Sequence, residues 1–111
     1  MVREVFLRCG AVPVVFAHSV IRLEGLRGAW RWLGSLGTRP LGAALFSDPR
    51  VQRTPLAFRA IGPRHPLFRR ATVVPASSLR PLWARRSLFL LEGAPLLVTE
   101  IFLPGILELP R

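Results

Sequence analysis

Residues 83–103, WARRSLFLLEGAPLLVTEIFL, decide the fold because they hold two apolar, strand-like runs separated by a short turn. The runs 83–91 and 95–103 are dominated by leucine, isoleucine, valine and phenylalanine, a composition typical of strands. The segment Glu92-Gly93-Ala94 between them is typical of a turn. We therefore predict an antiparallel hairpin near the carboxyl end of the chain.

A second hairpin is predicted at the amino end, from Val2–Cys9 and residues 13–23, with Gly10-Ala11 as the turn. The next segment, 26–37, is expected to be helical, because Leu26, Trp30 and Leu33 recur at helical spacing and glycines follow.

A second short helix is predicted over residues 40–46. Thr38 is a candidate cap for it and Pro40 suits its first turn, while Ser47-Asp48-Pro49 ends it. Residues 54–61 predict a further strand, because apolar side chains alternate along them. Residues 62–82 hold four prolines and are expected to form a loop, with at most one short strand at 72–74. The predicted fold class is α+β: a single antiparallel sheet with a short helix–loop–helix after the first hairpin.

Length and composition limit the class of protein. The 111 residues suit one domain, and a 50% apolar fraction excludes a disordered chain despite the net charge of +10. All 16 basic residues are arginines scattered along the sequence, with no run longer than two. This scatter argues against a nucleic-acid interface, which concentrates its positive charge.

The expected location is the cytoplasm. A lone Cys9 permits no internal disulfide and fits a reducing compartment. The longest stretch without a formal charge, residues 9–21, has 13 residues, whereas a membrane span needs about 20. We also see no secretory pattern at the start, and so expect no stable membrane insertion.

Two charged residues stand in otherwise apolar rows. Because side chains alternate across a strand, Glu100 shares a face with Leu96, Val98 and Phe102, and Arg3 shares one with apolar neighbours in the first strand. A buried, unpaired charge is costly. The two groups therefore either pair with each other, reach water at a sheet edge, or face a cavity that binds a polar ligand.

The sequence does not support a metal site, a hydrolase active site or a nucleotide-binding site. His18, His65 and Cys9 lack metal-like spacing, so no metal site is predicted. His65 lies in a proline-flanked loop, where contact with solvent is expected. The sequence contains no hydrolase nucleophile elbow, P-loop or dinucleotide fingerprint.

Four segments nevertheless resemble a known family. They are REVFLRC (3–9), LGTRPLG (36–42), LWARRS (82–87) and PLLVTEIFLP (95–104). In this order they resemble chorismate lyase, the chorismate–pyruvate lyase of bacterial ubiquinone biosynthesis. The resemblance covers essentially the whole chain.

The resemblance implies an antiparallel sheet whose helical flap covers a ligand pocket, and a cytoplasmic enzyme that eliminates pyruvate from chorismate to leave 4-hydroxybenzoate. It implies no metal or organic cofactor, and we expect a monomer. By motif position it places substrate-binding roles on Arg3, Leu41 and Glu100, with Arg3 and Glu100 as the catalytic pair. Arg3 would orient a substrate carboxylate. Leu41 would offer a backbone N–H at a helix start. Glu100, with a raised pKa, would contact the ether or ring oxygen, a general acid by hypothesis.

The chain departs from the family pattern in two respects. The family carries an additional amino-terminal region, so we expect residues 1–111 to be a chorismate lyase-like domain truncated at that end. The family also often carries arginine where His18 stands, so a flap contact made by that arginine is not expected to carry over to this chain.

The alternative function is a non-catalytic, small-acid-sensing domain. The effector-binding domains of GntR-type transcription regulators resemble chorismate lyase in fold and bind small acids without turnover. Incubation with chorismate discriminates the two, because a sensor binds but forms no product.

Overall fold

The computed structural model describes residues 1–37, 41–72 and 81–104. In chain order these residues form β1 (Val2–Cys9), β2 (Val12–Ile21), α1 (Leu23–Arg27), the 3₁₀ helix η1 (Arg31–Ser35), α2 (Leu41–Ser47), β3 (Gln52–Arg53), β4 (Ala57–Ile61), α3 (Pro66–Ala71), β5 (Leu82–Leu91) and β6 (Ala94–Phe102).

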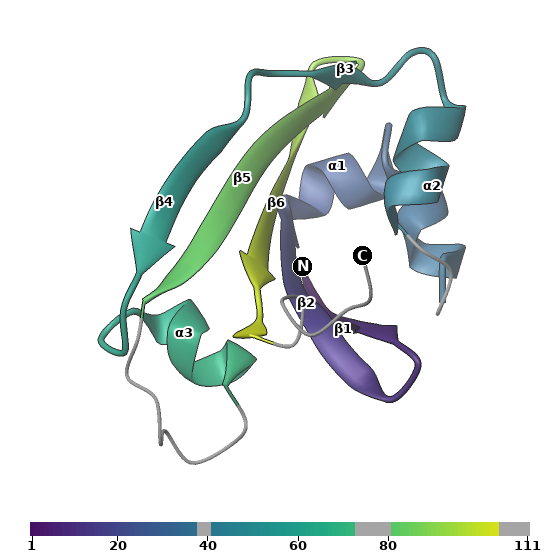
Figure 1. Cartoon of the computed structure of the whole chain (residues 1–111). Coiled ribbons are helices and arrows are strands. Elements are labelled where there is room, and N and C mark those ends of the chain that lie inside the picture. The colour runs from purple at the N-terminus through teal and green to yellow at the C-terminus, as the bar shows by residue number, and fades with distance from the viewer. Residues whose placement is uncertain (38–40, 73–80, 105–111) are drawn as a thin grey trace.

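All the strands join one antiparallel sheet, which confirms the α+β prediction (Figure 1). The strand order is β1-β2-β6-β5-β3, and β4 also pairs with β5. Both predicted hairpins are present, and β6 lies directly beside β2. The first and last strands of the chain are therefore separated by β2 alone.

The β5–β6 turn explains why the carboxyl-terminal hairpin is so well defined in the sequence. Glu92 and Gly93 both have positive φ, at 51° and 80°. Two such residues form the type I′ turn, whose twist matches that of the flanking strands. This turn sets the register that places Arg85 opposite Glu100.

Helices α1, η1 and α2, which we call the flap (residues 23–37 and 41–47), cover part of one sheet face. The side chain of Trp30, between α1 and η1, is fully buried and donates a hydrogen bond from Nε1 to the carbonyl oxygen of Ala94 in β6, at 2.9 Å. The apolar side chains buried between flap and sheet are those of Ile21, Trp30, Leu33, Leu36, Leu45, Phe89, Leu91, Leu96 and Val98. We call this side of the sheet the cavity face.

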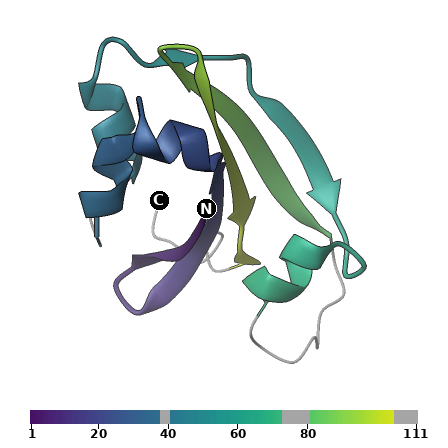
Figure 2. The ribbon, with the colours of Figure 1, turned by 180° about the vertical axis from the view of Figure 1, so that it is seen from behind.

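Helix α3 packs on the opposite side, the back face, and lies at the far end of the molecule from the flap (Figures 1 and 2). The prediction of a loop over 62–82 was wrong here. Pro66 stands in the first turn, where a missing N–H costs nothing, and His65 caps the helix by accepting from the backbone N–H of Leu67 at 3.1 Å. His65 thus caps a helix that was not predicted, and the residue is half-buried rather than fully exposed.

Two other predicted elements differ from the structure. The helix predicted over 26–37 is split into α1 and η1, because Gly28 ends α1 with a non-helical backbone. The strand predicted over 54–61 is present only as β4, since Pro55 has no N–H to donate to the ladder, and the two-residue β3 precedes it. Arg53 lies opposite Phe89 and Ala57 opposite Arg86, so the register shifts by one residue there.

The second flap helix, α2, agrees with the predicted 40–46 within a residue at each end. The proposed cap Thr38 and first-turn Pro40 lie outside the described residues, as does most of the short strand suggested at 72–74.

Candidate active site

The strand register brings Arg3 and Glu100 to the same face of the sheet. Arg3 on β1 is opposite Ser19 on β2, and Ser19 is in turn opposite Val98 on β6. Glu100 is opposite Ala17 on β2. Since residues two apart share a face, all of these side chains lie on the cavity face.

A cavity of about 630 Å³ opens between this face and the flap. Its volume falls in the range of about 300–1,000 Å³ that is typical of small-molecule sites. Its wall is formed by side chains and backbone of Arg3, Val5, Phe6, Leu7, Arg8, Ala17, Ser19, Gly37, Leu41, Gly42, Leu45, Phe89, Val98 and Glu100. The three residues singled out in the sequence, Arg3, Leu41 and Glu100, thus line one mostly apolar cavity.

Glu100 is paired with Arg85 rather than with Arg3. Arg85 on β5 donates to Glu100 Oε1 from Nη2 at 2.7 Å and from Nε at 3.0 Å. The guanidinium of Arg85 also lies over the ring of Phe102, 5.6 Å from its centre. The alternative in which Arg3 and Glu100 pair with each other was therefore wrong, since the ion-pair partner of Glu100 is Arg85 on the neighbouring strand.

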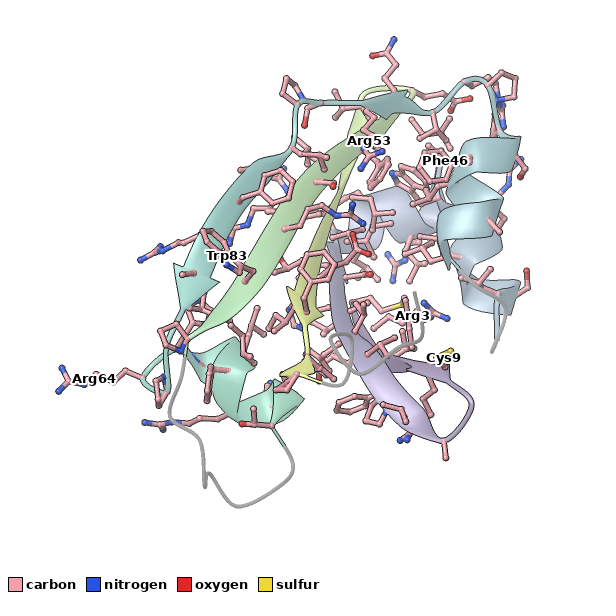
Figure 3. All side chains as sticks on the ribbon, in the orientation of Figure 1. Arg3, Cys9, Phe46, Arg53, Arg64 and Trp83 are labelled. Carbon is pink, nitrogen blue, oxygen red and sulfur yellow. The ribbon has the colours of Figure 1, made fainter. Side chains whose placement is uncertain are left out.

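Arg3 makes a different contact. Its Nη2 donates to the carbonyl oxygen of Gly37 in the flap, at 3.3 Å. Figure 3 shows Arg3 lying between the first hairpin and the flap helices. Gly37 has a φ of 61°, a left-handed conformation that suits glycine. Arg3 thus connects β1 to the flap at the rim of the cavity.

Leu41 approaches the cavity from the flap side. It is the first residue of α2 and is half-buried, and Gly42 and Leu45 of the same helix line the wall beside it. The first N–H groups of a helix have no partner within the helix. Leu41 therefore contributes apolar surface and stands where the backbone can donate a hydrogen bond.

His18 lies on the back face, away from the cavity. Its Nδ1 is 2.7 Å from Glu4 Oε2, and Glu4 Oε1 is also 2.8 Å from Arg70 Nη2 of α3. Strand alternation places this side chain on the side of the sheet opposite the flap. His18 instead belongs to an ionic cluster that connects the first hairpin with α3.

Arg85 is the residue of the site that the sequence reasoning missed. The motif LWARRS contains it, but the two adjacent arginines are equivalent by composition alone. What distinguishes them is the hairpin register: Arg85 is opposite Glu100, whereas Arg86 is opposite Thr99 on the back face. Counting back from the two-residue turn at Glu92-Gly93 would have found this pairing.

Within the described ranges, no group of three or more His, Cys, Asp or Glu side chains is arranged to hold a metal ion. Nor does that part of the chain contain a helix with the length and apolar composition needed to cross a membrane. The charged residues that line the cavity are Arg3, Arg8 and Glu100, of which Glu100 is paired with Arg85, and most of the remaining wall is apolar.

The sequence model of the family described as chorismate lyase matches residues 1–109. The chain belongs to the chorismate lyase family. It is 58% identical over 109 residues to a probable chorismate pyruvate-lyase of Nitrosomonas europaea, and 59% identical over 111 residues to one of Nitrosomonas eutropha. In both comparisons 98% of this chain is matched, and it spans 61% of the relative's length.

A similar relation holds with a probable chorismate pyruvate-lyase of Aromatoleum aromaticum, at 54% identity over 110 residues, covering 97% of this chain and 60% of the relative. Among solved structures, the ligand-binding domain of a putative GntR-family transcriptional regulator from Bordetella bronchiseptica has a TM-score of 0.58 at 19% identity. That alignment covers 93% of this chain and 67% of the regulator domain. At this identity the likeness concerns the fold alone, which is the chorismate lyase-like fold expected from the sequence.

Proposed function

We propose that this chain carries the active site of a chorismate–pyruvate lyase, which eliminates pyruvate from chorismate and leaves 4-hydroxybenzoate, the first committed step of ubiquinone biosynthesis. The observation that carries the proposal is the joint placement of Arg3, Leu41 and Glu100 around one apolar cavity, in a chain of the chorismate lyase family. The proposal includes a cytoplasmic location and chorismate as the substrate.

The proposed reaction needs no oxidant and no added water. The bond between the ring carbon and the enolpyruvyl oxygen breaks, the ring loses a proton from the neighbouring carbon, and the side chain gains a proton at its methylene carbon as it leaves as pyruvate. Formation of the aromatic ring drives the elimination. A protein accelerates such a step chiefly by orienting the substrate and excluding water.

The residues take roles that follow from their chemistry. Arg3 offers a planar fork of N–H donors, which suits the ring carboxylate of the substrate. Leu41 closes the wall from the flap side and presents its backbone N–H. Glu100 lines the cavity from the sheet, opposite the flap, and contacts an oxygen substituent of the ring. Because Arg85 already donates two hydrogen bonds to it, Glu100 acts here as a charged acceptor that positions the ring hydroxyl.

The test is to incubate the purified chain with chorismate and to measure pyruvate and 4-hydroxybenzoate separately. We expect the two products to appear at equal rates, and the Arg3→Gln variant to release them much more slowly. Binding of chorismate with no release of either product would contradict the lyase proposal. That outcome would favour the alternative of a small-acid-sensing domain.

A further inference from the structure

We infer that Arg85 is a positioning residue of this site: it neutralises and orients Glu100, so that an anionic aromatic ligand can occupy the cavity beside a carboxylate. The inference rests on the proposed function, since it names a further residue of the same site. It concerns a side chain that does not itself line the cavity and therefore acts through Glu100.

The hydrogen-bond geometry gives Arg85 control of one carboxylate oxygen. Both donors of Arg85, Nε and Nη2, reach the same atom, Glu100 Oε1. A guanidinium pair of this kind fixes the direction of the acceptor, because two donors on one rigid plane restrict it more than one. Glu100 Oε2 is not used by Arg85, and we assign it to the ligand.

Arg85 is itself held in place. Its position on β5 lies between Phe58 on β4 and Glu100 on β6. Its guanidinium contacts the face of Phe102, which is two residues beyond Glu100 on the same strand. Cation–π contact and ion pairing together restrict the guanidinium to the cavity face.

The charge balance supplies the physical reason for this arrangement. Chorismate carries two carboxylates, so an unpaired carboxylate at Glu100 would repel it across an apolar wall, where screening is weak. Arg85 cancels that charge locally without adding to Arg3 and Arg8, the two arginines that line the cavity. Its side chain is 31% exposed and that of Glu100 20% exposed, so the effect is moderate.

A double-variant cycle tests this role, with the affinity for 4-hydroxybenzoate measured by calorimetry and KM and kcat measured with chorismate. We expect Arg85→Gln to weaken 4-hydroxybenzoate binding about tenfold and to raise KM by a similar factor, because Glu100 is left unpaired. Adding Glu100→Gln should restore most of the affinity, although kcat stays low. Arg85→Lys, which keeps the charge, should retain more affinity than Arg85→Gln.

The matched control is Arg86→Gln, which removes the same charge one residue away, on the back face. It should leave affinity and KM unchanged. Melting temperatures of all variants separate misfolding from loss of function. If Arg85→Gln is unfolded, the affinity and KM of Arg85→Lys are compared with those of the parent instead. A merely structural Arg85 would give a double variant that binds as weakly as Arg85→Gln or more weakly, and that result would overturn the inference.

The affinity measurement with 4-hydroxybenzoate also distinguishes failure of this inference from failure of the proposed function. A chain that binds 4-hydroxybenzoate in the expected order of variants, but releases no pyruvate, would support Arg85 and contradict the lyase proposal. A chain that releases pyruvate, but whose affinity for 4-hydroxybenzoate is the same with and without Arg85, would support the lyase proposal and contradict the role of Arg85. A chain that neither binds 4-hydroxybenzoate nor turns over chorismate would overturn both.

Discussion

Arg3 donates a hydrogen bond to the carbonyl oxygen of Gly37, at 3.3 Å, and so connects the first strand of the sheet to the flap above it. The two residues are 34 positions apart, and both line the cavity. A ligand carboxylate held by Arg3 would therefore lie where the sheet and the flap meet. In the proposed function, the same guanidinium would contact the flap and bind the ligand carboxylate.

Replacing Arg3 by Gln should reduce kcat/KM for chorismate by about 10- to 100-fold. A charge-assisted hydrogen bond contributes about 1.5–3 kcal/mol, and each 1.36 kcal/mol corresponds to a factor of ten. Steady-state kinetics provide the measurement. Arg59→Gln, which removes a charge from an exposed position on β4, is the matched control and should leave kcat/KM unchanged. Equal losses in the two variants would mean that Arg3 acts through net charge alone.

Replacing Glu100 by Gln should lower kcat by about 100-fold while changing the affinity for 4-hydroxybenzoate only a few-fold. The amide oxygen still accepts a hydrogen bond from the ring hydroxyl, but the charge that assists proton movement is lost. Glu92→Gln, in the exposed β5–β6 turn, is the control. An unchanged kcat in Glu100→Gln would leave Glu100 with a binding role only.

Replacing Trp30 by Phe should lower the free energy of unfolding by about 1–3 kcal/mol. The variant removes the indole donor to the half-buried carbonyl oxygen of Ala94 and part of the fully buried ring of Trp30. Denaturant unfolding followed by circular dichroism measures the change. Trp83→Phe is the matched control, because Trp83 is 62% exposed on β5 (Figure 3). Comparable losses from the two substitutions would show that Trp30 does not hold the flap to the sheet.

Asp48, which directly follows the flap, makes a pH-dependent contribution to the free energy of unfolding. Hydrogen bonds from the side chain and backbone of Arg50 hold the pKa of Asp48 below its ordinary value of about 3.9. A lowered folded-state pKa stabilises the fold above the unfolded pKa, and this contribution is lost as the pH falls through the folded one. Asp48→Asn should therefore be slightly less stable than the parent at pH 7, and the difference should shrink as the pH falls through the folded-state pKa of Asp48. A difference that persists or grows in acid would contradict this assignment.

The sequence predicted the hairpins and the sharing of one face by Glu100 and its apolar neighbours, because strand alternation and turn chemistry are local properties. It did not predict α3. Proline is read as a helix breaker, yet Pro66 stands at the one helical turn that tolerates it, and the packing of Phe68 on Ile101 and Phe16 is not visible from local pattern.

The partner of Glu100 was missed for a related reason. Alternation along β6 identifies a charge on an apolar face, but the residue that neutralises it is fixed by the register with β5. Register depends on the geometry of the turn, which the sequence encodes in Glu92 and Gly93. For a charged residue on an apolar strand, the residue opposite it in the adjoining hairpin should therefore be identified first, by counting from the turn, before a more distant partner is assigned.

The most direct measurement is a crystal structure of the chain with 4-hydroxybenzoate bound. We predict density for the ring between β1 and α2, with its carboxylate within hydrogen-bond distance of Arg3 and its hydroxyl directed to Glu100 Oε2. Density for the ligand elsewhere, or in this cavity with the carboxylate turned away from Arg3, would contradict the assignment of the site.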